Sequence, residues 1–74
     1  MNKQRREKIR ELRNEIETCK DKLQTILDEE QDYFDNMPEN LQGSMRGSDS
    51  EDAIDTMTEC IDGLDEVIKE LLGI

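Results

Sequence analysis

No glycine or proline occurs between Lys3 and Asp35 of this 74-residue chain. These two residue types are the strongest interrupters of helices, so residues 3–35 are able to form one continuous helix. Such a helix would be about 50 Å long at a rise of about 1.5 Å per residue. This predicted rod constrains the architecture more than any other feature, because the whole chain is short enough for one small domain at most.

Apolar residues within this stretch recur at alternating steps of three and four, which is the period of an amphipathic helix. With Ile9 at heptad position a, Leu12 falls at d, and Leu27 and Phe34 fall at e. The pattern has one gap, at Glu30. The a and d series is Ile9, Leu12, Ile16, Cys19, Leu23, Ile26 and Tyr33.

A second stretch with the same spacing predicts a helix over residues 49–73. Ser48 and Glu51 have the spacing of a capping box, which marks its start. The a and d positions hold Ile54, Met57, Ile61, Leu64, Ile68 and Leu71, and the g positions hold Ala53, Cys60, Val67 and Ile74. The apolar stripe of this helix is therefore three columns wide.

Residues 36–48 are predicted to form a structured capping loop. Pro38 suits the first position of a short helical turn. Met37, Leu41 and Met45 recur every fourth residue and are expected to fold over the end of the helices. The alternative is a flexible linker.

The fold class follows as all-α, a single domain over 1–74 in which the two long helices form an antiparallel hairpin. Charge placement agrees with this arrangement. Residues 1–13 hold six bases and two acids, whereas five acids and no bases lie between Asp28 and Asp35. Each cluster has the wrong sign for its own helix end, but in a hairpin it lies beside the opposite pole of the other helix.

Two registers align the a and d positions of the helices, with Ile26 opposite either Ile54 or Ile61. The first is preferred because it places Lys20 beside Asp65. Neither register places Cys19 opposite Cys60, because the residue that faces Cys19 is Ile61 in one and Ile68 in the other. The sequence therefore predicts packing thiols without an internal disulfide.

A single helix pair is too narrow to cover these stripes, since a two-stranded seam uses only a and d. Self-association of two hairpins into a four-helix bundle supplies the missing surface most simply, and a partner protein is the alternative. The residues predicted for the core or oligomer seam are Leu23, Ile26, Leu27, Phe34, Ile54, Met57, Cys60, Ile61, Leu64, Val67, Ile68 and Leu71.

The residue inventory argues against an enzyme and against a cofactor. The chain has no histidine, which is the commonest general base and zinc ligand. It has no glycine-rich phosphate loop, and both cysteines lie in helical apolar columns. Acids at the hairpin mouth lack EF-hand spacing and are expected to be solvated. With no membrane span, no signal peptide and only two cysteines, we expect a cytoplasmic protein.

Acidic residues dominate the chain beyond its first turns. Residues 14–74 carry eighteen acids and four bases. Six acids step by three or four along the second predicted helix and form an acidic ridge: Asp52, Asp55, Glu59, Asp62, Glu66 and Glu70. Such a row resembles nucleic-acid phosphates and would suit a protein partner with a basic groove. The competing interpretation is a solvated face that keeps the chain soluble.

The start of the chain is basic, in contrast to the acidic residues that follow it. Lys3, Arg5, Arg6, Lys8 and Arg10 form a small cluster that would extend past the second helix. Two interspersed acids and a net charge of -10 make duplex DNA a poor target, so direct nucleic-acid binding is not expected.

The segment between the helices also resembles a group of small uncharacterised helical proteins of phages and mobile elements of gut bacteria. The matching residues are the basic start, the run Tyr33-Phe34-Asp35-Asn36-Met37-Pro38-Glu39-Asn40-Leu41-Gln42, then Ser44, Arg46, Gly47 and Ala53-Ile54-Asp55. Gly43 and Ser48-Asp49-Ser50 depart from the more acidic, helical sequence of that group. The resemblance implies an accessory phage protein, among which stoichiometric inhibitors of host defence proteins are common. A scaffolding coiled coil and a small regulator that contacts nucleic acid through its basic start are the alternatives.

Overall fold

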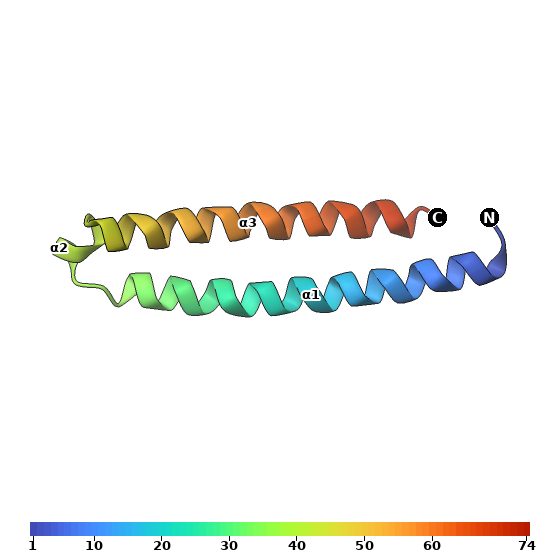
Figure 1. The fold of residues 1–74 in the computed structure, drawn as a ribbon, viewed down its shortest axis with the longest axis horizontal. Coiled ribbons are helices and arrows are strands. Elements are labelled where there is room, and N and C mark those ends of the chain that lie inside the picture. Colours follow the sequence, from blue (N-terminus) through green and yellow to red (C-terminus); the bar gives the residue numbers. More distant parts are fainter.

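The computed structural model describes residues 1–74 as three helices and no strands: α1 (Lys3–Asp35), α2 (Glu39–Gln42) and α3 (Met45–Leu72). The two long helices run side by side in opposite directions, with α2 at the turn between them (Figure 1). The molecule measures 58 × 15 × 12 Å, and its radius of gyration is 17.0 Å. A compact domain of this length would have a radius of about 11 Å. The chain is therefore an all-helical rod one helix pair thick.

Helix α1 spans the same residues as the predicted helix, and side chains satisfy both of its ends. The Asn2 side chain accepts a hydrogen bond from the Arg5 amide at 2.9 Å. At the other end the Asn36 side chain donates to the Asp32 carbonyl at 2.8 Å, and the Gln42 side chain donates to the Phe34 carbonyl at 3.2 Å. These bonds cover backbone groups that a helix end leaves without partners.

Helix α3 begins at Met45, four residues earlier than the sequence predicts, and the Ser48–Glu51 capping box is not its start. Ser44 is the N-cap, and its side chain accepts a hydrogen bond from the Gly47 amide at 3.4 Å. The earlier start depends on Gly47. A Cβ atom there would lie 2.0 Å from the Gln42 carbonyl oxygen, so only glycine lets α2 pack against the first turn of α3.

The cap at this end is structured, but it is smaller than predicted. Met37 is 9% exposed and closes the end of the helix pair. Leu41 is 40% exposed and Met45 is 82% exposed, so neither covers the end as expected. Their four-residue spacing failed as a guide because the chain between Met37 and Met45 is not one helix. Pro38 is the N-cap residue of α2 and not its first helical residue.

The inner seam, where α1 packs on α3, runs along columns a and e of α1 and not along a and d. Its partly covered residues on α1 are Ile9, Arg13, Ile16, Lys20, Leu23, Leu27, Glu30 and Phe34. On α3 the seam is Ile54, Met57, Ile61, Leu64, Ile68 and Leu71, of which Ile68 is the most buried at 8% exposure. Because α1 turns its a and e columns toward α3, Leu27 and Phe34 lie in the seam. The remaining e positions hold Arg13 and Lys20, whose alkyl stems are able to cover apolar surface.

Candidate interaction surfaces

The inner seam leaves apolar residues of both helices uncovered. Leu12 is 50% exposed, Ile26 53% and Tyr33 47% on α1, while Val67 on α3 is 42% exposed and Ile74, just past the end of α3, is 51% exposed. Cys19 and Cys60 are exposed and free. We call these seven residues the outer apolar face. Three residues predicted for the core or oligomer seam, Ile26, Cys60 and Val67, belong to it and not to the inner seam.

The outer apolar face lies on one side of the hairpin. Lys20 and Asp65 both occupy e positions and are bonded to each other, so the e columns of the two helices flank the seam on the same side. On α1, column d lies across column a from e. On α3, column g lies beyond d, also away from e. Columns d of α1 and g of α3 therefore flank the opposite side together.

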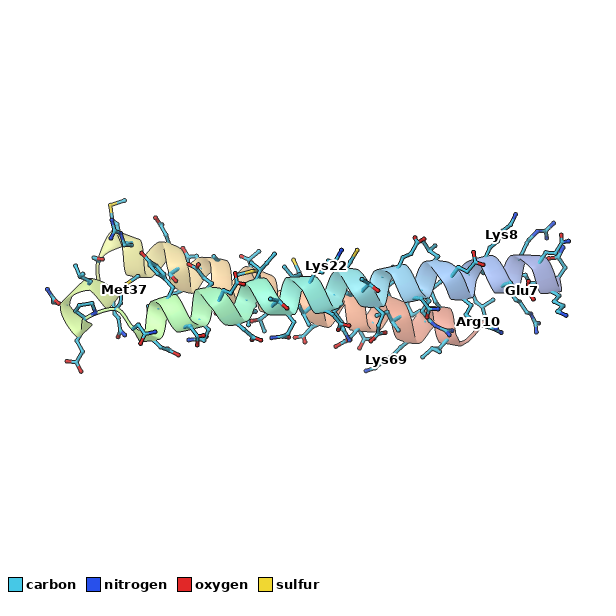
Figure 2. All side chains as sticks on the ribbon, turned by 90° about the horizontal axis from the view of Figure 1, so that it is seen from below. Glu7, Lys8, Arg10, Lys22, Met37 and Lys69 are labelled. Atoms are coloured by element: carbon cyan, nitrogen blue, oxygen red, sulfur yellow. The ribbon has the colours of Figure 1, made fainter.

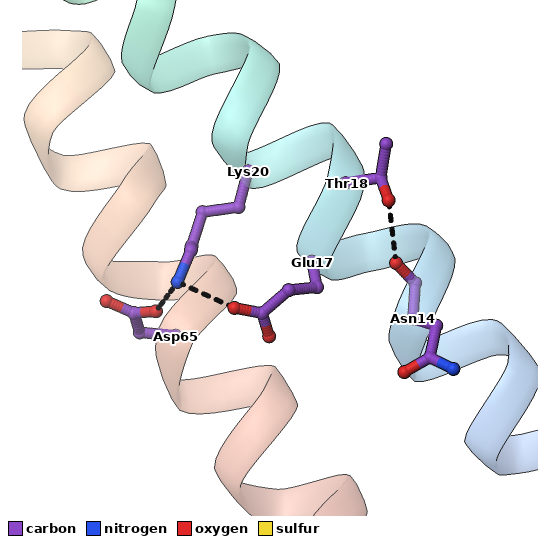
Figure 3. A network of polar contacts seen from close by, with 5 residues as sticks. All are labelled: Asn14, Glu17, Thr18, Lys20 and Asp65. Atoms are coloured by element: carbon purple, nitrogen blue, oxygen red, sulfur yellow. Dashed lines mark hydrogen bonds and ion pairs between the residues drawn. The ribbon is translucent and has the colours of Figure 1, made fainter.

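The Lys20 ammonium joins the helices in the middle of the rod (Figure 3). It donates to Asp65 Oδ1 at 2.7 Å and to Glu17 Oε1 at 3.3 Å. The hydrogen bonds to Asp65 and then to Glu17 hold the pKa of Lys20 above its ordinary value. This contact confirms the predicted neighbour pair Lys20 and Asp65.

The Ser50–Glu30 bond agrees with the preferred level of the two helices along the rod, but the predicted facing pairs are not formed. Ile26 and Cys19 lie in column d, outside the inner seam, and both are exposed, so neither forms the facing pair predicted for it. The thiols predicted to be packing residues are exposed in the hairpin. The physical reason is the choice of column e over column d for the seam.

Ser50 and Glu30 form a polar contact between the helices near the cap. Ser50 is 2% exposed, and its hydroxyl donates to Glu30 Oε1 at 2.8 Å. Glu30 is the gap in the apolar series of α1, and Ser50 lies on the covered side of α3. Neither residue was singled out as a pair from the sequence. The sequence did offer one indication: Glu30 is a polar residue at an a position, and a covered polar group needs a hydrogen-bonding partner across the seam.

All six residues of the acidic ridge are exposed, as expected for a contact surface and equally for a solvated one. They occupy positions b, c and f of α3, away from the inner seam. Glu66 is the only one with a cation in reach, 3.8 Å from Lys69 Nζ. The other five carboxylates have no ion pair within the chain.

The basic start of α1 projects past the end of α3 (Figure 1). Where α3 ends, three arginines and four apolar residues line a shallow open groove: Arg6, Ile9, Arg10, Arg13, Leu71, Leu72 and Ile74. The arginines lie beside the carbonyl end of α3, where their positive charge compensates the partial negative charge of the helix end, as predicted.

No three cysteine or carboxylate side chains converge in an arrangement that would hold a metal ion. Neither long helix contains a stretch apolar enough to cross a bilayer.

No protein-family model matches the chain, and neither the curated proteins nor the solved structures include a significantly similar one.

Proposed function

We propose that the chain is a non-enzymatic protein-binding module that docks on a basic groove of another protein through its acidic ridge. The observation that carries the proposal is the row of exposed carboxylates on α3, of which five have no cation nearby. Like charges three or four residues apart destabilise a helix by a few tenths of a kcal/mol per pair. The ridge therefore does not serve the stability of α3, and an outside cation partner offsets the repulsion.

The working unit in this proposal is a homodimer in which two hairpins form a four-helix bundle. The outer apolar face supports it, because two helices alone leave seven apolar or thiol side chains in solvent. Five of the six residues of the acidic ridge occupy b and f positions, away from that face, and stay accessible in such a bundle.

The narrower proposal is a phage-type inhibitor that binds a bacterial defence protein stoichiometrically in the host cytoplasm. Its ground is the resemblance of the segment from Tyr33 to Gln42, together with the basic start, to small helical proteins of phages and mobile elements. The charge row of the ridge suits a groove that otherwise holds nucleic acid.

Affinity capture from a bacterial lysate, followed by mass spectrometry, tests the ridge. The variant reverses Asp55, Glu59 and Asp62 to lysine. The control reverses Glu7, Glu11 and Asp21 on α1, so that the net charge changes equally. We expect a protein that the wild type and the control capture at low salt, that the ridge variant loses, and whose capture falls steeply as salt rises.

Folding of all three proteins is checked by circular dichroism, since exposed substitutions change stability by about 0.5 kcal/mol or less. Capture of the same protein by the ridge variant would remove the ridge as the contact. A scaffolding role would then be favoured, because the outer apolar face alone accounts for assembly.

A further inference from the structure

The hairpin exposes more surface than a compact chain of this mass would. The hairpin exposes 5688 Å² in total. A compact monomer of 8.7 kDa would expose about 4,700 Å². The excess of about 950 Å² is close to the ~800 Å² that each partner contributes to a standard protein interface.

A column of alternating charge borders this face on α1. Lys8, Glu15, Lys22 and Glu29 follow one another at heptad spacing, all exposed and none in an ion pair. Lys8 and Lys22 project along the same upper edge in Figure 2, whereas Arg10 and Lys69 lie along the lower edge. In an antiparallel second copy this column runs in the opposite direction. Lys8 of one copy then lies opposite Glu29 of the other, and Glu15 lies opposite Lys22. A parallel copy in register would bring like charges together.

We propose that the outer apolar face binds a second copy of this chain in antiparallel orientation, with α1 lying on α1 and a two-fold axis beside Cys19. The proposal rests on the homodimer proposed above and specifies its geometry. Residue 19 is the midpoint of α1, so the two copies of this helix overlap from end to end. Leu12 then lies opposite Ile26, and Cys19 opposite its own copy.

The ends of α1 agree with the same axis. The basic first turns of α1 project past α3 (Figure 1). In the proposed dimer they lie over the acidic last turns of the second copy's α1. Arg5 lies opposite Tyr33, where a guanidinium over an aromatic ring is favourable. The projecting turns, which have no partner within the hairpin, acquire one.

The apolar column of α3 is compatible with the same axis. The bonds Lys20–Asp65 and Ser50–Glu30 place Cys19 level with residues 61–66 of α3. An axis at that level pairs Cys60 with Val67 of the second copy. The g column of α3 is thus self-complementary about the same point as the d column of α1.

The competing stack places α1 of one copy on α3 of the other, which would bring Cys19 beside Cys60 of the second copy. A short bismaleimide distinguishes the two arrangements when it is applied to the wild type, Cys60→Ala and Cys19→Ala. Both thiols are exposed in the hairpin, so each variant keeps its fold, and circular dichroism verifies this.

We expect Cys60→Ala to form a covalent dimer at least as efficiently as the wild type, in which Cys19 and Cys60 of one chain can also react with the same reagent, and Cys19→Ala to form none. In the proposed dimer the two Cys60 residues are offset by seven residues, about 10 Å along the axis. Crosslinking of the wild type alone, or of Cys19→Ala, overturns the proposed axis. Sedimentation equilibrium separates the failures: a monomer contradicts the dimer itself, whereas a dimer that crosslinks wrongly contradicts only its geometry.

A charge swap tests the orientation without chemistry at the thiols. Glu15→Lys and Lys22→Glu each turn two attractive contacts of the dimer into repulsive ones and are expected to raise its dissociation constant roughly tenfold. The double variant restores both contacts and returns the constant to near the wild-type value. A double variant that dissociates more readily than either single variant contradicts the proposal.

Discussion

Neighbouring residues of α1 with almost the same hydrophobicity lie on different surfaces of this molecule. Leu27 and Phe34 are partly covered in the inner seam, whereas Ile26 and Tyr33, one residue earlier in each case, are about half exposed. On α3, Ile68 is covered and Val67 is exposed. Both surfaces hold apolar residues, but only the inner seam also holds side-chain hydrogen bonds between the helices, Lys20–Asp65 and Ser50–Glu30.

This difference shows that hydrophobicity sets the width of the apolar stripe, while a few specific contacts decide which part of it closes the hairpin. The remaining part is then available to another chain.

The largest effect is expected from Ile68→Ala, which removes the most buried aliphatic side chain of the seam. The loss should be about 2–5 kcal/mol. A core of this size supplies only about 3–5 kcal/mol, so urea or thermal melts should show a largely unfolded population. Val67→Ala on the outer apolar face should leave the hairpin folded and weaken self-association. Equal destabilisation by both variants would contradict the division into two surfaces.

Gly47→Ala should have the next largest effect, because the added Cβ would overlap the Gln42 carbonyl oxygen. We expect a loss of about 1–3 kcal/mol, measured by chemical denaturation. Gly63→Ala is the matched control, since nothing lies within 4 Å of a Cβ at that site. It should raise helix stability by up to about 1 kcal/mol. A neutral Gly47→Ala would mean that α2 does not need its close contact with α3.

Ser50→Ala should cost about 1 kcal/mol, because it leaves the Glu30 carboxylate without its donor across the seam. Ser48→Ala tests the discarded capping box and should change the free energy of unfolding by less than about 0.5 kcal/mol. Reversal of this order would restore Ser48 as the start of α3.

The smallest effect concerns pH. The folded-state pKa of Lys20 is raised above 10.5, so its charge stabilises the hairpin throughout the neutral range. That contribution is lost as pH rises through the folded pKa, because the unfolded chain releases this proton at a lower pH. Lys20→Met should remove this part of the alkaline loss of stability in melts from neutral pH to above 10.5. A variant with the same alkaline profile as the wild type would show that the Asp65 contact is not coupled to folding.

Periodicity and the absence of helix breakers were enough to predict the all-helical class, α1 and the wide stripes. The start of α3 was mispredicted because a sequence pattern cannot show that Gly47 touches the Gln42 carbonyl oxygen. The cap was overestimated for the same reason, as Leu41 and Met45 lie on different helices. The choice of column e over column d depends on Phe34, Lys20 and their partners on α3, which are contacts between distant residues. The acidic ridge was predicted to be exposed because b, c and f positions face away from a helix partner.

Sedimentation equilibrium at tens of micromolar tests the central claim, that the outer apolar face binds a second copy of the chain. The wild type should give twice the chain mass of 8.7 kDa, while Ile26→Glu, which places a charge on that face, should give 8.7 kDa with its helix content kept. A wild type that is fully helical and sediments at 8.7 kDa would contradict the account.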